Sequence, residues 1–336
     1  MTASAALYGC EGLTLTADER RFFQEARPFG YILFARNCDT PEQIRALCNA
    51  LRGDNPSALI FIDQEGGRVA RLKPPQWKAR PPAKRFGDLF AEDPEKGRET
   101  AYLCARLIAH DLYLLGITAD CAPVLDVPSP GAHDIIGDRA YSGDPATVIE
   151  LGRAAIDGFL DGGVLPVIKH IPGHGRALAD SHLELPRVAA SEAELSGRDF
   201  VTFRGLNHAP MAMTAHVVYE AIDAKRAATL SPRVVRKVIR GEIGFDGLLM
   251  TDDLSMKALT GSLASLTKSA LFAGCDIVLH CNGRLDEMKE IAGEVPPLSR
   301  PALRRAEAAL SHLRAPAPLD IARAEARLNE LAGPIA

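Results

Sequence analysis

A short apolar run followed by a polar loop and then an amphipathic stretch recurs along this chain. This alternation constrains the fold more than any other feature. Eight apolar runs have the length of strands, and they cover residues 6–8, 30–34, 58–62, 117–121, 165–169, 212–214, 248–251 and 276–279. Stretches with helical periodicity cover residues 41–51, 94–115, 145–161, 232–240 and 263–273. Several of them open with an N-cap residue followed by proline, which favours a helix start.

Eight strands that alternate with helices predict an α/β fold, a (β/α)8 barrel of the TIM type. A doubly wound sheet is the alternative, because spacing along the chain does not show whether a sheet closes. The 336 residues, of which 47% are hydrophobic, suffice for one large core. We therefore expect a single catalytic domain over residues 1–336, in which residues 301–336 form terminal helices packed on the barrel.

Composition excludes several classes of protein. The net charge of −4 argues against a nucleic-acid partner, which would need a clustered basic face. No apolar run reaches the length of a membrane span, and the first residues lack the features of a signal peptide. The seven cysteines show no CxxC spacing, which argues against a zinc ribbon or a disulfide framework. We expect a cytoplasmic protein without a membrane partner, and a monomer.

Polar side chains gather where the apolar runs end. The run at 165–169 leads into KHIPGHG at residues 169–175, with DSH at 180–182 shortly after. The runs at 58–62 and 248–251 lead into Asp63 and into Asp252-Asp253, and His216 follows the run at 212–214. Because the carboxyl ends of barrel strands meet at one mouth, these side chains are expected to share one polar pocket.

Four motifs occur in an order that resembles glycoside hydrolase family 3. They are DQEGGRVAR at residues 63–71, IGDRAYS at 136–142, KHIPGHG with DSH at 169–182, and TDDLSM at 251–256. The resemblance runs from about residue 9 to residue 281. Within that family, the chain is most similar to the single-domain bacterial β-N-acetylhexosaminidases. Ile171 and Tyr141 stand where phenylalanine is usual, and both substitutions keep an apolar body.

The resemblance implies a retaining exo-β-N-acetylglucosaminidase that acts through a covalent glycosyl-enzyme. Its substrates would be anhydro-muropeptides derived from peptidoglycan, in cell-wall recycling, and it would need no metal or cofactor. Asp252 is then the nucleophile, His182 the general acid/base and Asp180 its partner in a dyad. The residues that the resemblance assigns to binding N-acetylglucosamine are Asp63, Arg71, Arg139, Lys169 and His170.

The chemistry of these residue types agrees with that assignment. Retaining hydrolysis needs a nucleophile on one face of the sugar and a proton donor near the leaving oxygen. A histidine suits the second task because its unperturbed pKa of about 6.5 lies near neutral pH. From the residues alone Asp253 competes with Asp252 as the nucleophile, and His174 is equally suited to substrate binding and to bracing its loop. Asp120 and Asp126 are interpreted as scaffold.

Four other functions fit parts of the pattern. His170, His174, Asp180 and His182 could hold a metal ion, although Lys169 would repel a cation. Lys169 at a strand end would suit a Schiff-base aldolase, which leaves Asp252 without a role. A sugar-binding protein would have no use for an acid/base dyad. A phosphorylase stays open, because a histidine acid would not repel an incoming phosphate.

Overall fold

Eight parallel strands close into a barrel, in the order β1, β2, β3, β4, β5, β7, β9, β10 and back to β1. The computed structural model describes residues 3–53, 55–131, 133–177 and 184–333. The barrel strands are β1 (Ser4–Gly9), β2 (Pro28–Leu33), β3 (Leu59–Ile62), β4 (Ala119–Asp120), β5 (Leu165–Ile171), β7 (Met211–Thr214), β9 (Leu248–Asp253) and β10 (Ile277–His280). Each overlaps one of the eight predicted strands. The closed sheet confirms the TIM-type barrel and excludes the doubly wound alternative.

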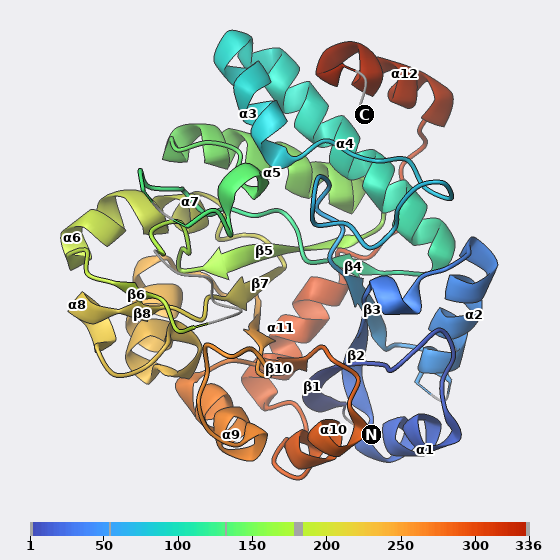
Figure 1. Cartoon of the computed structure of the whole chain (residues 1–336), viewed down its shortest axis with the longest axis vertical. Helices are drawn as coiled ribbons and strands as arrows, with labels where there is room; N and C mark the ends of the chain where they lie inside the picture. Colours follow the sequence, from blue (N-terminus) through green and yellow to red (C-terminus); the bar gives the residue numbers. More distant parts are fainter. Residues whose placement is uncertain (1–2, 54, 132, 178–183, 334–336) are drawn as a thin grey trace.

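Helices surround the barrel (Figure 1). The α-helices are α1 (Ala17–Ala26), α2 (Pro41–Arg52), α3 (Ala83–Glu92), α4 (Pro94–Leu115), α5 (Pro145–Asp161), α6 (Glu192–Glu194), α7 (Phe200–Gly205), α8 (Glu220–Asp223), α9 (Leu263–Ala273), α10 (Leu285–Ala292), α11 (Arg300–Leu310) and α12 (Ile321–Ala332). Shorter or wider turns form η1 (Ala35–Asn37), η2 (Gly137–Arg139), η3 (Leu195–Asp199), η4 (Ala228–Leu230) and η5 (Val234–Glu242). Among the described residues, no helix is both long and apolar enough to cross a membrane.

Capping explains why the helices start where they do. The Asp93 and Asp144 side chains accept backbone N–H bonds at the starts of α4 and α5, and proline occupies the first helical position of both. The unpredicted α1 begins with a capping box between Thr16 and Glu19. The sequence did not indicate α1 because its large apolar side chains, Phe22 and Phe23, are adjacent and do not repeat at helical spacing. The predicted helix at 232–240 is found as the π-helix η5.

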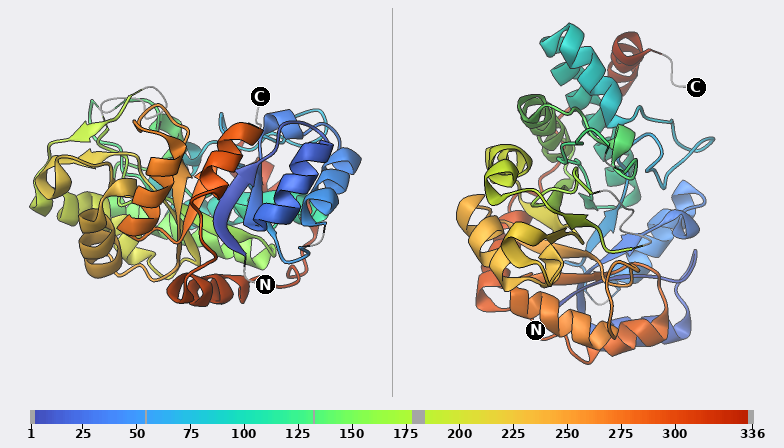
Figure 2. Two further views of the ribbon diagram at one scale, coloured as in Figure 1. Left: turned by 90° about the horizontal axis from the view of Figure 1, so that it is seen from below. Right: turned by 60° about the vertical axis from the view of Figure 1, so that its left-hand side comes forward.

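The interior of the barrel is filled by alternate residues of the strands. Leu7, Phe61, Val167 and Met250 belong to this inner cluster, and their chain neighbours face outward into the second core. The inner cluster also contains Leu298, Ala302, Ala306 and Ala309, so that α11 covers the amino ends of the strands. Figure 2 (left view) shows α11 as a red helix below the barrel. Because α11 closes the barrel at the amino ends of the strands, the open end of the barrel is the one at the carboxyl ends of the strands.

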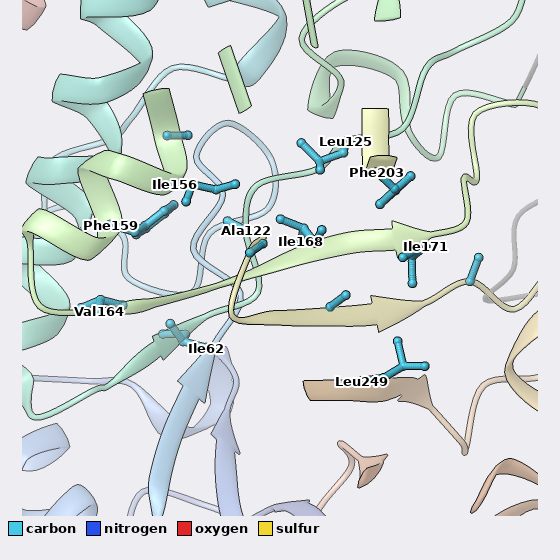
Figure 3. Packing of buried hydrophobic residues seen from close by; sticks show 14 of the residues in the cluster. Ile62, Ala122, Leu125, Ile156, Phe159, Val164, Ile168, Ile171, Phe203 and Leu249 are labelled. Atoms are coloured by element: carbon cyan, nitrogen blue, oxygen red, sulfur yellow. The ribbon is translucent and has the colours of Figure 1, made fainter. Parts of the chain in front are cut away.

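A second core lies between the outside of the barrel and the helices. In Figure 3, Ile156 and Phe159 of α5 lie beside Val164, just before β5, and Ile168 of β5, and Phe203 of α7 lies near Leu125. The α12 helix lies beside α4 at the edge of the molecule (Figure 1). All seven cysteines are within the described residues and are free thiols, six of them buried.

A separate two-stranded parallel sheet flanks the mouth of the barrel. It pairs β6 (Arg187–Val188) with β8 (Val218–Tyr219). The Tyr219 hydroxyl donates a hydrogen bond to the Gly173 carbonyl at 2.5 Å. Strands of two residues carry no periodic pattern, which is why the sequence did not indicate them. The small sheet ties the loop after β5 to the loop after β7.

Candidate active site

The alternation that fills the barrel also brings charged side chains to its mouth. Asp63 lies two residues beyond Phe61, Lys169 two beyond Val167 and Asp252 two beyond Met250, so that each continues an inward-facing row. They line a pocket of about 390 Å³ at the carboxyl ends of the strands. The remaining lining residues are Ile32, Phe34, Glu65, Arg68, Val69, Arg71, Ile135, Ile136, Arg139, His170, His174, Met213, Asp253, Met256, Leu279 and Cys281.

A belt of alternating charges runs around this pocket. The Lys169 ammonium lies 2.9 Å from Asp63 Oδ1 and 2.6 Å from Glu65 Oε1. Arg71 pairs with the other Asp63 oxygen at 3.0 Å. Arg139 forms a two-point pair with Glu65, with Nε–Oε2 and Nη2–Oε1 distances of 2.9 and 2.8 Å. Two carboxylates and three cations are thereby joined in one chain of contacts, which we call the charged belt.

Pairing keeps Asp63, Glu65 and Lys169 ionised. Burial alone would raise the pKa values of Asp63 and Glu65, but the adjacent cations outweigh it and hold both below their usual range. Burial would likewise lower the pKa of Lys169, and the two carboxylates raise it instead. A Schiff-base enzyme needs a neutral lysine amine, so this ammonium argues against the aldolase alternative.

The loop after β3 is shaped to present Asp63, Glu65 and Arg71 together. The Gln64 side chain accepts hydrogen bonds from the N–H groups of Arg71 and Leu72 at 2.8 and 3.0 Å. Gly66 adopts a φ of +96°, and a Cβ there would lie 2.5 Å from the Pro81 carbonyl oxygen. Only glycine permits both the turn and this close approach.

Beneath this loop lies Asp120, which is fully buried. Its Oδ1 accepts the Gln64 N–H at 2.9 Å, whereas its Oδ2 has no hydrogen-bond partner in the described part of the chain. Burial, reinforced by the charges of Asp63 and Glu65, raises the pKa of Asp120 to about 8. Asp120 therefore supports the loop as a neutral carboxylic acid at neutral pH.

A second polar group surrounds His170. The register between β5 and β7 shifts after Lys169, and this irregularity lets Lys169 and His170 both line the pocket. The His170 Nδ1 lies 2.7 Å from Asp126 Oδ2, and Asp126 Oδ1 accepts the His174 N–H at 2.6 Å. Burial opposes the ionised form of Asp126, but His170 holds its pKa below the usual range.

Asp126 therefore accepts a hydrogen bond from His170 Nδ1–H, which leaves Nε2 for the pocket. The His174 ring lies edge to face with His170, 5.6 Å between centroids. Burial, and after it the neighbouring His170, lower the pKa of His174 to about 4, which keeps it neutral. The close approach of Gly175 to Val127 helps to fix this loop, since a Cβ there would lie 2.0 Å from the Val127 carbonyl oxygen.

The two neighbouring aspartates at the end of β9 differ in what they contact. The Asp253 carboxylate accepts hydrogen bonds from Ser255 Oγ at 2.7 Å, from the Ser255 N–H at 3.0 Å and from the Cys281 N–H at 3.3 Å. The Asp252 carboxylate accepts one from the Asp253 N–H at 2.8 Å, and no other among the described residues. Asp253 thus braces its loop, whereas Asp252 keeps its lone pairs for the pocket.

His216 lies behind Asp252 and is fully buried. A carbonyl oxygen only accepts, so the His216 Nε2–H donates to the Asp253 carbonyl at 3.0 Å, and Nδ1 lies 2.7 Å from the Thr229 hydroxyl. Burial raises the pKa of Asp252, but His216, then His170, the Asp253 N–H and Lys169 together lower it below its usual value. Asp252 is a carboxylate at neutral pH, as a nucleophile requires.

The structure thus brings together six of the eight residues singled out for catalysis and binding: Asp63, Arg71, Arg139, Lys169, His170 and Asp252. The other two, Asp180 and His182, lie outside the described residues. Asp63 pairs with Arg71 and Lys169, whereas Arg139 pairs with Glu65. No three His, Cys, Asp or Glu residues in the described ranges are placed to hold a metal ion.

Sequence reasoning missed Glu65. Phe61, Asp63 and Glu65 follow the spacing of two residues that identified Asp63, so the signal was present. Glu65 was not singled out because it lies in the loop beyond the strand, where side chains are no longer expected to alternate between the two faces. Asp126 was interpreted as scaffold, and its contacts show which side chain it positions.

Comparisons with known proteins identify relatives of this chain. The family model of the glycosyl hydrolase family 3 N-terminal domain matches residues 15–312. A beta-hexosaminidase from Alkalilimnicola ehrlichii is 41% identical over 288 residues, which are 84% of this chain and 82% of the relative. A beta-hexosaminidase from Pseudomonas aeruginosa is 39% identical over 296 residues, covering 86% and 87% of the two chains.

Solved structures agree with these relatives. Native NagZ from Neisseria gonorrhoeae superposes with a TM-score of 0.88 at 30% identity, and 99% of each chain is covered. The same protein in complex with N-trifluoroacetyl-D-glucosamine matches with a TM-score of 0.88 at 29% identity, again over 99% of each chain.

Proposed function

The chain belongs to glycosyl hydrolase family 3 and is a glycoside hydrolase of the β-hexosaminidase type. We propose that it is a retaining exo-β-N-acetylglucosaminidase, which releases N-acetylglucosamine through a covalent glycosyl-enzyme. The observation that carries this proposal is the state of Asp252, a carboxylate with a lowered pKa that lines the pocket and accepts a single hydrogen bond from the described residues.

Asp252 is the nucleophile in this mechanism and Asp253 is not. A nucleophilic oxygen has to approach the anomeric carbon with a free lone pair. The three hydrogen bonds that Asp253 accepts from Ser255 and Cys281 hold its carboxylate against the loop. His216 fixes the backbone just beyond Asp252 and thereby orients the nucleophile.

The charged belt binds the terminal sugar. Sugar hydroxyls both donate and accept hydrogen bonds, and charged partners make those bonds stronger. Asp63, Arg71, Arg139 and Lys169 present donors and acceptors around one pocket, and His170 directs Nε2 to the same pocket. The barrel core closes the pocket below, which fits the binding of one terminal sugar residue, and the family resemblance implies that this residue is the non-reducing end.

His182 serves as the general acid/base and Asp180 as its partner. Both lie outside the described residues, and their assignment rests on the KHIPGHG and DSH motif. A histidine gives a proton to the leaving oxygen and later takes one from water, and an aspartate stabilises its charged form.

We further propose a cytoplasmic role in peptidoglycan recycling, with anhydro-muropeptides as substrates and a monomeric enzyme. The free, mostly buried cysteines fit a reducing compartment. No cofactor is invoked, because nucleophile, acid/base and sugar contacts account for the reaction. The aglycone would lie above the pocket, where Phe34, Val69, Ile135 and Met256 form an apolar rim.

The stereochemistry of the product tests the mechanism. Proton NMR during hydrolysis of p-nitrophenyl N-acetyl-β-glucosaminide should show the β-anomer of N-acetylglucosamine first, followed by slow mutarotation. An initial α-anomer would show inversion at the anomeric carbon and would exclude a mechanism through a covalent glycosyl-enzyme. Comparing kcat/KM for GlcNAc-anhydroMurNAc with that for chitobiose would test the aglycone, since equal values would argue against recycling as the role.

A further inference from the structure

Acidic and basic side chains alternate in the described lining of the pocket. Among the described residues, four acidic and four basic side chains line it, together with His170 and His174: Asp63, Glu65, Asp252 and Asp253 against Arg68, Arg71, Arg139 and Lys169. Carboxylates that pair with these cations weaken the field that would otherwise attract anions into the pocket.

Glu65 is the residue on which this balance depends most. Its Oε1 lies 2.6 Å from the Lys169 ammonium and 2.8 Å from Arg139 Nη2, and its Oε2 accepts from Arg139 Nε at 2.9 Å. Its side chain is 7% exposed and that of Lys169 is 2% exposed. One carboxylate thus occupies two cations of the pocket.

The guanidinium of Arg139 is the group that an anion would otherwise seek. Arginine presents parallel N–H donors that match the oxygens of phosphate as well as those of a carboxylate. Here the matching edge is filled by Glu65, and Arg139 Nη1 donates to the Ile135 carbonyl at 3.1 Å. Asp63 is a less complete competitor, because it pairs one oxygen each with Lys169 and Arg71.

We propose that Glu65 is a specificity-determining residue, which excludes small oxyanions such as inorganic phosphate from the pocket by occupying Arg139 and Lys169. The inference deepens the proposed function, on which it rests for the identity of the pocket as the sugar site.

The test measures phosphate binding directly, with no sugar present, by isothermal titration calorimetry at constant ionic strength. Wild type should bind phosphate weakly, and Glu65→Gln should tighten its dissociation constant by at least about tenfold, because Arg139 and Lys169 gain a free partner site. Glu65→Ala, which leaves room for water, should show the same gain and serves if the amide variant is unstable.

Glu99→Gln is the matched control. Glu99 forms a similar two-point pair with Arg327, both distances being 2.8 Å, where α4 meets α12 and outside the pocket. This variant should bind phosphate as weakly as wild type. The double variant Glu65→Gln, Arg139→Gln should lose most of the gain.

Unchanged phosphate affinity in both folded Glu65 variants would overturn the proposal. So would a gain that Arg139→Gln does not reduce, because the anion would then bind elsewhere. Neither result depends on glycosidase activity, so a failure of this inference is separate from a failure of the proposed function.

Discussion

Replacing the buried acid Asp120 by asparagine should stabilise the protein, and the gain should grow with pH. Asparagine keeps the oxygen that accepts the Gln64 N–H at 2.9 Å and removes the titrating group. The folded-state pKa of Asp120 is raised from 3.8 to about 8, mainly by burial. The folded protein therefore holds a proton that the unfolded chain releases above about pH 4, so this group costs wild type stability as the pH rises.

The pKa shift sets the size of the effect. Each pH unit between the unfolded and folded pKa values costs roughly 1.4 kcal/mol, so the variant should gain up to about 4 kcal/mol on wild type between pH 4 and pH 7. We expect a gain of about 2 to 4 kcal/mol at pH 7. Above about pH 8 both states are ionised and the difference should level off.

Thermal and denaturant unfolding at several pH values would measure this difference. Asp126→Asn provides a comparison of opposite sign. The pKa of Asp126 is lowered, so its stabilisation is present above the unfolded value and is lost as the pH falls. The reasoning is refuted if the difference between Asp120→Asn and wild type is flat with pH, or if the variant loses ground as the pH rises.

Three further predictions concern activity. Lys169→Met leaves Asp63 and Glu65 without the cation that lies 2.9 and 2.6 Å from them. This variant should lower kcat/KM by about 100-fold or more and reduce the thermal midpoint, because two buried carboxylates lose their partner. Near-normal kinetics would show that Lys169 has no role in the site. His182→Ala should slow substrates with poor leaving groups far more than activated aryl glycosides, and equal losses in a two-substrate assay would exclude it as the acid. Dialysis against a chelator should leave kcat/KM unchanged, whereas a loss restored by zinc would support the metal alternative.

Much of the fold could be predicted because it is periodic. The rows that place Phe61 and Val167 inside the barrel also place Asp63 and Lys169 at its mouth, so fold and pocket follow from one pattern. The two-residue strands β6 and β8 are too short to carry such a pattern. The sequence also did not predict which charged side chains form pairs, because the contact of Glu65 with Arg139 joins two loops that are 74 residues apart along the chain.

The choice between Asp252 and Asp253 shows the same limit. Neighbouring identical residues have the same propensities, and what separates them is the set of N–H groups each meets. Those donors come from Ser255 and from Cys281, and Cys281 lies at the end of another strand. Tertiary contacts of this kind become visible only in a structure.

The central claim is that Asp252 performs retaining hydrolysis of terminal N-acetyl-β-glucosaminides. The most direct test is the hydrolysis of p-nitrophenyl N-acetyl-β-glucosaminide by wild type and Asp252→Ala, with p-nitrophenyl β-glucoside as the substrate control and phosphate varied. We predict turnover specific to the N-acetyl sugar, indifferent to phosphate, and abolished in Asp252→Ala while sugar binding remains. A variant that keeps near-full activity, or turnover that requires phosphate, would contradict the account.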